Sequence, residues 1–552
     1  MYPHLRGSQV PAAKTLTHPI SENLRGIPGF HDLNTYYPGM KILTGVHPSS
    51  SDVWFDHRSR VIRASHDSIK ASGRLNLRIE RNVSAAGQEI QDISGFRKIT
   101  HLLDPVRWIQ GKYMIPKGRK MNFDKKSWGT AWEKIKDPMN QAYIEALASY
   151  AFGKIRENDL SPHFHLFYGS FSAKADTYAY NITDSFLSYR HCRWFWTSQE
   201  NKVFSLGFDD DIPEEVKSEI ITPPEDFDST DEEDEDEELD SDSNPDVELG
   251  SLHSASGSDI ETASEDDEED EDEEEDNEIT IYAEIQDFPV MMIYTEASEG
   301  TMDTLLDNYD QVGSKPGSEL WEATWKAWIF QTLAALSLAQ SIFGFTHNDL
   351  HTNNIVWSTT KTEYLYYSTK DGVIFKVPTY GKLFKIIDFG RSIFRVNDKF
   401  FFSDDFKEGN DAADQYFFKE LEQERDEDEV VPNPSFDLCR FTVSVFESLF
   451  PSTPTEKKDG GVLSNEPGLI IKETDSTLYN LLWSWLLCDD GHNVLMNSDG
   501  SERYPDFDLY KVIAAQVHGA IPSEQIRKPL FEIFHVEKEN IPLDTKVYSL
   551  YC

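Results

Sequence analysis

Apolar and polar residues alternate in the first half of the chain in the manner of β-strands. Alternating runs at 75–79 and 89–93 and a shorter run at 96–99 predict three strands, with a small-residue loop at 82–87 and a tight turn at 94–95. Consecutive strands joined by such short connections pair antiparallel. The pattern therefore predicts a β-rich part that begins near residue 75.

Helix-like spacing and further apolar runs complete the pattern. Apolar residues over 142–155 recur at the helical period and predict a helix. Other runs predict strands at 163–169, 190–196, 290–296, 355–357 and 383–387, a hairpin within 363–377, and helices that begin near 434 and at 478. Because strands dominate before residue 296 and helices after it, the expected fold class is α+β.

One apolar run, residues 327–346, carries no charged residue over twenty positions. A run of that length can cross a lipid bilayer. It contains Gln331 and Gln340, however, and leads directly into a polar segment. We therefore interpret the run as a buried helix and expect no membrane span.

Composition adds an acidic insertion. The 552-residue chain has a net charge of −46, and removing the 29 acidic residues between Glu225 and Asp276 leaves −17. Residues 209–278 are dominated by Asp, Glu, Ser and Thr, which bury too little apolar surface to offset chain entropy. We expect a disordered insertion there that either solubilises the chain or binds a basic partner. Such an acidic chain is not expected to bind nucleic acid over most of its surface.

Two other segments lack regular periodicity. Residues 1–50 mix Pro, Gly, His and Tyr, which predicts an irregular N-terminal arm. Residues 107–136 hold nine basic and two acidic residues with three tryptophans. We interpret this basic insertion as a solvated segment that the acidic insertion of the same chain can pair with. The alternative is a surface for RNA or lipid head groups.

Cysteine usage and the N-terminus indicate the compartment. The four cysteines are far apart, with no Cys-x-x-Cys pair, as is typical of a reducing environment. The first residues lack the apolar core of a signal peptide. We therefore expect an intracellular protein that is not secreted.

Candidate chemistry is concentrated in a polar segment and a later triplet. The segment is His347-Asn348-Asp349-Leu350-His351-Thr352-Asn353-Asn354, and Asp388-Phe389-Gly390 follows with its aspartate 39 residues after Asp349. Phosphoryl transfer from ATP requires a carboxylate that orients and deprotonates the attacking hydroxyl, and hard oxygen ligands for Mg²⁺. Asp349 can provide the first, and Asn354 and Asp388 can provide the second.

Zinc binding is the alternative interpretation of the polar segment. His347 and His351 are four residues apart, as in a zinc-binding helix. Asn348 stands where that motif carries a glutamate, and Asn353-Asn354 suits a loop better than a helix. The sequence therefore disfavours zinc at this segment.

His-x-Asp-x-x-x-x-Asn followed by Asp-Phe-Gly resembles the protein kinase superfamily. The resemblance implies a bilobal protein-kinase-like fold, with a small β-rich N-lobe over residues 51–295 and a larger α-helical C-lobe over residues 296–552. It also implies ATP and Mg²⁺ as cofactors. In that family Asp349 corresponds to the catalytic base, and Asn354 and Asp388 correspond to the metal ligands.

The resemblance assigns roles to residues outside these motifs. Lys98, on the third predicted strand, corresponds to the lysine that holds the ATP phosphates, and Glu145, in the predicted helix, to the glutamate that pairs with it. Glu296, Ala297 and Ser298 correspond to the hinge, whose backbone bonds the adenine edge. These residues are the expected nucleotide-binding set.

The chain departs from the family at several positions. Only Gly87 occupies the predicted phosphate-covering loop. Asn348 replaces the arginine that reads a phosphorylated activation segment, and His351 replaces the lysine common two residues after the base. Asp437, in contrast, stands where kinases use a buried aspartate to brace the loop backbone.

Shorter phrases favour one branch of the family. Residues 101–113, 167–171 and 504–510 resemble serine/threonine protein kinases of large nucleocytoplasmic DNA viruses. That likeness implies a protein substrate with a Ser or Thr acceptor, and a location in the host cytoplasm or the virion. His351 also resembles small-molecule kinases, and the single glycine is compatible with a pseudokinase scaffold. Both remain alternatives.

Overall fold

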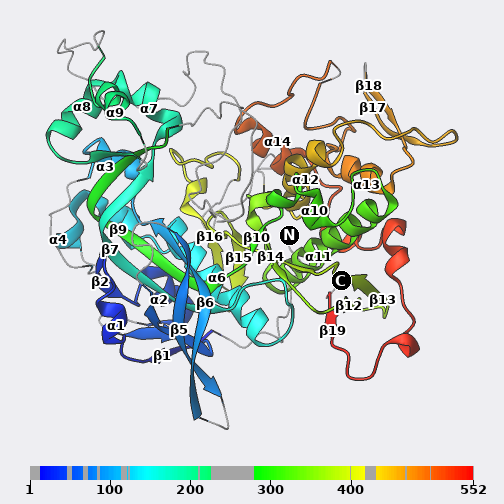
Figure 1. Cartoon of the computed structure of the whole chain (residues 1–552), viewed down its shortest axis with the longest axis horizontal. Coiled ribbons are helices and arrows are strands. Elements are labelled where there is room, and N and C mark those ends of the chain that lie inside the picture. Colours follow the sequence, from blue (N-terminus) through cyan, green and yellow to red (C-terminus); the bar gives the residue numbers. More distant parts are fainter. Residues whose placement is uncertain are drawn as a thin grey trace, which may run out of the picture.

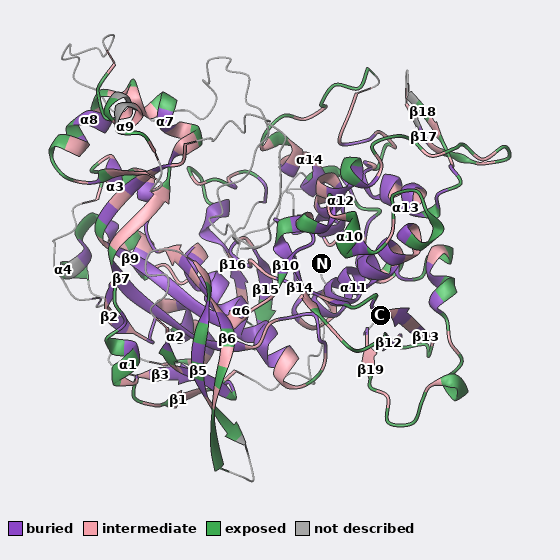
Figure 2. Cartoon of the chain, viewed as in Figure 1, coloured by how far each residue is buried: buried purple, intermediate pink, exposed green. Residues whose placement is uncertain are grey.

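The computed structural model has a mixed α/β architecture, with one large antiparallel sheet on one side and a group of helices on the other (Figure 1). It describes residues 13–46, 52–65, 72–83, 87–113, 121, 125–208, 212–224, 279–397, 399–416, 431–466, 469–497 and 499–550. Buried residues run through the sheet and the centre of the helical group (Figure 2), and they form one contiguous hydrophobic cluster. The two sides therefore share a core.

The large sheet has the strand order β2-β7-β9-β6-β5-β4, with β8 paired to β9, and neighbouring strands are antiparallel. Its strands are β2 (Phe30–Asn34), β4 (Ser59–Ala64), β5 (Gly73–Val83), β6 (Gly87–His101), β7 (Phe167–Asn181), β8 (Ser205–Phe208) and β9 (Ile281–Glu296). Residues 288–294 of β9 are all buried, as expected for a strand covered on both faces. β9 lies between β6 and β7 and forms the centre of the sheet.

Helix α6 (Gln141–Glu157) packs against β7 and β9. It begins at Asn140, whose side chain accepts a hydrogen bond from the Ala142 amide, an arrangement typical of a helix N-cap. Gly153 allows a close approach, because a Cβ there would lie 2.7 Å from the Cβ of Phe167. The helix predicted over 142–155 is confirmed, and nearly all of its side chains are buried.

The helical side is centred on α11 (Glu319–Phe343), which is capped by Ser318 at its start and by Gly344 at its end. Around it lie α10 (Tyr309–Val312), α12 (Phe436–Leu449), α13 (Thr477–Trp485), α14 (Asp508–Gln516) and α15 (Pro522–Gln525). The buried helix predicted near 327–346 is confirmed by α11. Within the described ranges, no helix combines the length and the apolar character needed to cross a membrane.

The remaining elements are short. The other helices are α1 (Glu22–Arg25), α2 (Pro38–Thr44), α3 (Pro105–Ile109), α4 (Lys125–Trp128), α5 (Trp132–Lys136), α7 (Thr183–Arg190), α8 (Arg193–Glu200) and α9 (Glu214–Ile220). The 3₁₀ turns are η1 (Gly129–Ala131), η2 (Asp303–Leu305), η3 (Thr352–Asn354), η4 (Asp404–Phe406), η5 (Pro529–Phe534) and η6 (Lys538–Asn540). Together they connect and cover the larger elements.

Within the described residues, five small sheets accompany the large one. In two of them a central strand pairs with two neighbours: β11 (Ile355–Thr359) with β10 (Gly300–Thr301) and β14 (Lys382–Ile386), and β12 (Tyr364–Ser368) with β13 (Ile374–Pro378) and β19 (Val547–Ser549). The other three are strand pairs: β1 (Thr15–Thr17) with β3 (Val53–Phe55), β15 (Ile393–Val396) with β16 (Lys399–Phe402), and β17 (Val462–Glu466) with β18 (Leu469–Lys472). The predicted hairpin within 363–377 is the antiparallel pair β12 and β13. The strands predicted at 355–357 and 383–387 are neighbours, β11 and β14.

Several predictions are wrong in the sheet region. The turn expected at 94–95 does not occur, because β6 runs without interruption from Gly87 to His101. Gly95 instead lets two strands approach, since a Cβ there would lie 2.2 Å from Leu77 Cδ1. Residues 190–196 are not a strand but cover the end of α7, a short turn and the start of α8. The aromatic residues that suggested a strand pack between these helices.

The flanking and inserted segments also differ from the predictions. Residues 13–46 are not an irregular arm, because they include α1, α2 and β2, and β2 joins the large sheet. Of the acidic insertion expected over 209–278, residues 212–224 are described and contain α9, whereas 225–278 lie outside the described residues. In the basic insertion, Lys134 pairs with Asp404 at 2.6 Å, so one of its charges has a partner outside the acidic insertion.

Candidate active site

Residues 346–354, termed the polar loop here, are joined to the chain around the Asp-Phe-Gly triplet. The Thr346 amide donates to the Ile393 carbonyl at 3.0 Å, and the Ile393 amide donates to the Thr346 carbonyl at 2.9 Å. His347 Nε2 donates to the carbonyl of Ile387 at 2.8 Å. The loop therefore lies against the residues immediately before and after the triplet.

The carboxylate of Asp437, in α12, braces the backbone of the polar loop. It accepts hydrogen bonds from the His347 amide at 2.9 Å and the Asn348 amide at 2.9 Å. Asn348 has a φ of 64°, a left-handed conformation that a non-glycine residue keeps only when its surroundings enforce it. The bracing position predicted for Asp437 is confirmed.

Asp349 is buried in the middle of the polar loop, where its Oδ1 accepts a hydrogen bond from the Tyr510 hydroxyl at 2.9 Å. Burial alone would raise the pKa of this carboxyl. The guanidinium groups of Arg391 and Arg440, together with neighbouring histidines, outweigh burial and hold the pKa below its usual value. Asp349 is therefore an ionised carboxylate at neutral pH, as a proton acceptor must be.

Asn354 closes the polar loop and links it to Asp388. Its side-chain nitrogen, Nδ2, donates to the backbone carbonyl of Asp349 at 2.9 Å and lies 3.0 Å from His351 Nε2. The backbone carbonyl of Asn354 accepts a hydrogen bond from the Ile387 amide at 3.1 Å. The side-chain nitrogen already contacts Asp349 and His351. The side-chain oxygen, Oδ1, is therefore the atom of Asn354 that is suited to bind a cation.

Lys98, Glu145 and Asp388 form a cluster that we call the ionic triad. Lys98 Nζ lies 2.7 Å from Asp388 Oδ1 and 3.5 Å from Glu145 Oε2. The three residues come from β6, α6 and the turn after β14, and Asp388 has a left-handed φ of 63°. The structure thus brings together three residues that are up to 290 positions apart in the chain.

The charges of the ionic triad set its pKa values. Burial would lower the pKa of Lys98, but the carboxylates of Asp388 and Glu145 raise it overall. Burial raises the pKa of Glu145 to about 7, with Lys98 opposing that shift and Asp388 adding to it. One ammonium shared by two carboxylates leaves an excess of negative charge, which favours a bound cation.

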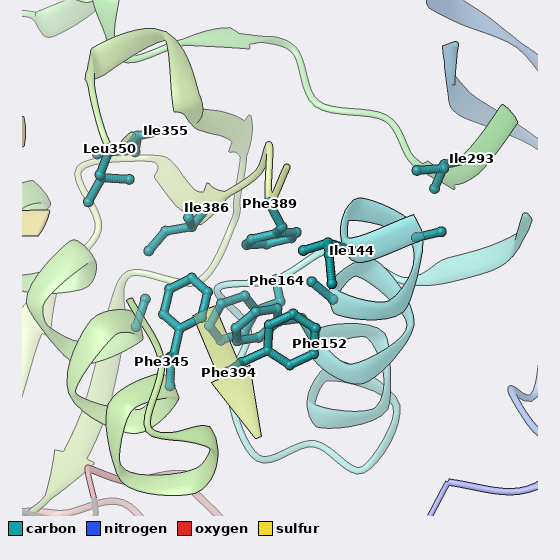
Figure 3. Close-up of a cluster of buried hydrophobic side chains, with 14 of the residues drawn as sticks. Ile144, Phe152, Phe164, Ile293, Phe345, Leu350, Ile355, Ile386, Phe389 and Phe394 are labelled. Carbon is teal, nitrogen blue, oxygen red and sulfur yellow. The ribbon is translucent and has the colours of Figure 1, made fainter. Parts of the chain in front are cut away.

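Phe389 connects the triad to the helical side of the molecule (Figure 3). Its ring stacks on Phe152 of α6, with centroids 4.6 Å apart, and meets the edge of Phe345 at 6.1 Å. Phe152 also stacks on Phe164 at 4.4 Å. In Figure 3 these rings fill the space between α6, which carries Glu145, and the segment that leads into the polar loop. Their packing fixes α6 relative to the triplet.

The expected hinge residues lie at the end of β9, where the chain leaves the large sheet. The Glu296 amide donates to the Leu166 carbonyl at 3.0 Å, and the Arg74 guanidinium donates to the Ser298 carbonyl. Ala297 lies between them. Two of the backbone groups assigned to the adenine edge thus already have partners within the chain.

The expected phosphate-covering loop is wrong in position. Gly87 begins β6, and Lys98 lies eleven residues further along the same strand, roughly 35 Å away at the usual strand rise. The connection between β4 and β5 ends closer to Lys98, because the Ile99 amide donates to Ser72 Oγ at 2.8 Å. Residues 66–71 of that connection lie outside the described residues.

Three residues of the site were not anticipated from the sequence. Tyr510 bonds Asp349, Arg440 Nε donates to the Tyr510 hydroxyl at 2.8 Å, and Arg391 adds positive charge beside Asp349. Arg391 directly follows the triplet, which is a signal that sequence reasoning could have used. Tyr510 is 161 residues from Asp349. It ends the phrase at 504–510, but that phrase gave no sign of a contact with Asp349.

One other group of ligand-type side chains occurs in the described part of the chain, away from the triad. Cys488, Asp490 and His492 place ligand atoms within 4.8 Å of one another. Both ring nitrogens of His492 already have partners, Asp490 and the Tyr504 hydroxyl. These residues include none of the polar loop or the ionic triad.

Sequence comparisons give no further guidance to the site. No protein-family model matches the chain, and no curated protein matches it.

Proposed function

We propose that this protein is an ATP-dependent phosphotransferase with a bilobal protein-kinase-like fold, which transfers the γ-phosphoryl group to a Ser or Thr hydroxyl of a protein. The observation that carries the proposal is the ionic triad, in which Lys98 pairs with both Glu145 and Asp388. The triad is joined to the loop that holds Asp349 and Asn354 by the Ile387–Asn354 hydrogen bond. Five residues selected by one functional hypothesis thus lie in one connected network.

The architecture supports the same hypothesis. β4, β5 and β6 are successive antiparallel strands, and the third presents the lysine, as the resemblance requires. The next long helix, α6, carries the glutamate. The polar loop and the triplet then follow on the helical side, after the sheet has ended at Glu296. This order matches that of a β-rich N-lobe followed by a helical C-lobe.

Asp349 acts as the base in this mechanism. Its lowered pKa keeps the carboxylate ionised, so that it can orient the acceptor hydroxyl and take its proton. The Asp437 brace holds the backbone next to Asp349, which restricts the position of the carboxylate. Positioning of this kind is the main contribution that a protein makes to phosphoryl transfer.

Asn354 and Asp388 are the residues that would hold Mg²⁺. Their amide and carboxylate oxygens are hard ligands, and the excess negative charge of the triad suits a divalent cation. When bound, Mg²⁺ neutralises negative charge on the phosphates. Lys98 adds an ammonium to the same phosphates, and Glu145 orients Lys98.

A small-molecule kinase is the second candidate. The position that carries a lysine in many serine/threonine kinases holds His351, whose Nε2 lies 3.0 Å from Asn354 Nδ2. Burial lowers the pKa of His351, with Asp349 opposing the shift, so the ring is neutral at physiological pH. The polar loop then offers no lysine ammonium at this position. Phosphorylation of a metabolite but of no protein would favour this candidate.

Radiolabel transfer tests the proposal directly. The full chain is incubated with γ-labelled ATP, Mg²⁺ and casein, alongside the Asp349→Asn and Asp388→Asn variants. We expect label on casein with the wild type and a loss of at least a hundredfold with either variant, with unchanged circular dichroism. Absence of transfer, together with no thermal shift on addition of Mg²⁺ and ATP, would refute the proposal in favour of a pseudokinase scaffold.

A further inference from the structure

A tyrosine from the C-terminal part of the chain contacts the carboxylate of Asp349. Tyr510 lies in α14 and donates its hydroxyl proton to Asp349 Oδ1 at 2.9 Å. Arg440, in α12, donates from Nε to the same hydroxyl oxygen at 2.8 Å. The hydroxyl thus relays an arginine charge to the carboxylate through two short hydrogen bonds.

Packing holds Tyr510 in place. The ring is 9% exposed and stacks on Phe507 at a centroid distance of 5.2 Å, with Phe436 at 5.9 Å. The Arg440 guanidinium lies 5.1 Å from the ring centroid, within cation–π range. A side chain confined on these sides is a fixed part of the site rather than a group that leaves when an acceptor binds.

Tyr510 occupies a role that the polar loop leaves open. In the kinase resemblance, a lysine two residues after the base lies beside the base. Here that residue is His351, which faces Asn354. The contact to Asp349 comes instead from Tyr510 in α14, 161 residues further along the chain. The charged or titratable groups that face Asp349 are Arg391, His351, Arg440, His347 and Tyr510.

We propose that Tyr510, supported by Arg440, is a positioning residue that fixes the orientation of the Asp349 carboxylate and leaves Oδ2 to accept the substrate proton. This inference rests on the proposed phosphotransferase function. In this inference Tyr510 and Arg440 position the base, as the lysine two residues after the base does in the kinase resemblance.

The kinetic test uses Tyr510→Phe, which removes only the hydroxyl. We expect kcat to fall about tenfold, the effect of losing one hydrogen bond to a charged group, while KM for ATP and for the acceptor stays within twofold. Arg440→Lys should retain more activity than Arg440→Met, because it keeps the positive charge. Tyr367→Phe is the matched control, since Tyr367 is also buried and its hydroxyl bonds His163 Nε2 at 2.7 Å, a residue outside the polar loop and the ionic triad. It should leave kcat unchanged.

A double-mutant cycle tests the contact without relying on activity. The unfolding equilibrium constants of the wild type, Tyr510→Phe, Asp349→Ala and the double variant are measured by chemical denaturation. We expect the combined effect to differ from the product of the single effects by at least about fivefold. Tyr367→Phe combined with Asp349→Ala should show no such coupling.

The outcomes separate this inference from the function on which it rests. An inactive wild type overturns the proposed function and the positioning role together. An active wild type with an unaffected Tyr510→Phe variant, a loss confined to KM, or an uncoupled cycle overturns the positioning role alone. Reduced kcat with unchanged KM and a coupled cycle supports it.

Discussion

The two carboxylate environments of the candidate site have opposite electrostatics. In the ionic triad, Glu145 and Asp388 share the single ammonium of Lys98, so negative charge is in excess. Around Asp349, one carboxylate faces two guanidinium groups and two imidazoles. The first environment suits a cation, and the second suits an ionised base next to an anionic phosphate. A phosphotransferase needs both close together, and Asn354 links them through Asp349 and Ile387.

The pKa values follow the same contrast. Burial raises the pKa of Glu145 to about 7. Burial acts in the same direction on Asp349, but the surrounding positive charges reverse the outcome and lower its pKa. Equal burial thus gives opposite results because the neighbours differ. Substitutions can change the environment of Asp349, the ionic triad, or the packing that joins the two.

The largest effect is expected for Asp349→Asn, which removes the base and keeps its shape. We expect kcat to fall about a thousandfold with little change in KM for ATP, because proton transfer is lost while nucleotide binding remains. Steady-state kinetics with labelled ATP measures this. Asp371→Asn is the control, since Asp371 is an exposed partner of Arg527 in the turn between β12 and β13. More than a tenth of wild-type activity in Asp349→Asn would exclude Asp349 as the base.

Phe389→Ala breaks the packing between the two environments. Loss of the stack on Phe152 should lower the free energy of unfolding by about 4 kcal/mol and weaken Mg²⁺–ATP binding, because α6 and Glu145 lose their support. Thermal denaturation and binding titrations report the two effects. The matched variant is Phe401→Ala, a buried ring in β16 that should lose similar stability without a change in binding. Equal binding losses in both would contradict a specific link through Phe389.

Asp437→Ala removes the brace on the Asp349 side. Two buried backbone amides, those of His347 and Asn348, would lose their acceptor, at a cost of about 3 kcal/mol in the free energy of unfolding. Asp437→Asn keeps one acceptor oxygen and should recover part of this loss. Denaturant titration of the three proteins gives the comparison. A fully stable Asp437→Ala protein would show that the brace contributes nothing.

The smallest effect concerns the pH dependence of the triad. Glu145 must be ionised to orient Lys98, and its pKa is about 7, so kcat/KM should rise with pH through that value. Glu145→Gln should lower kcat/KM about tenfold at pH 8 and abolish the rise. An unchanged acid limb in this variant would assign the titration to another group.

Stability should show the opposite trend with pH. The folded pKa of Glu145, about 7, lies above its ordinary value of 4.5, so the folded state binds more protons than the unfolded chain between these values. The stability of the wild type should therefore fall as pH rises from about 4.5 to about 7. Denaturant unfolding across this range should be flatter for Glu145→Gln. A wild-type profile that rises over the same range would contradict the raised pKa.

Sequence reasoning succeeded where chemistry depends on short spacing. The polar loop, the triplet and Asp437 all stand at positions fixed by local motifs, and the Asp437 brace is present as predicted. Lys98 and Glu145 were predicted from the order of elements, and the ion pairs between Lys98 and both carboxylates agree with that order. The helix over 142–155 was readable because its apolar spacing is regular.

The errors arise where one residue type serves two physical purposes. Gly95 suggested a turn, but its lack of a Cβ serves a close strand contact with Leu77. The aromatic run near 195 suggested a strand, but aromatic side chains also fill the space between two short helices. The contact of Tyr510 with Asp349 could not be predicted, because it depends on the tertiary packing of α14.

Calorimetric titration of ATP, with and without Mg²⁺, into the wild type and Asp388→Asn tests most directly whether the triad and the polar loop form one metal–nucleotide site. We expect the wild type to bind ATP at least tenfold more tightly when Mg²⁺ is present, and Asp388→Asn to lose that gain. Equal ATP affinity in both proteins, with no dependence on Mg²⁺, would contradict the account.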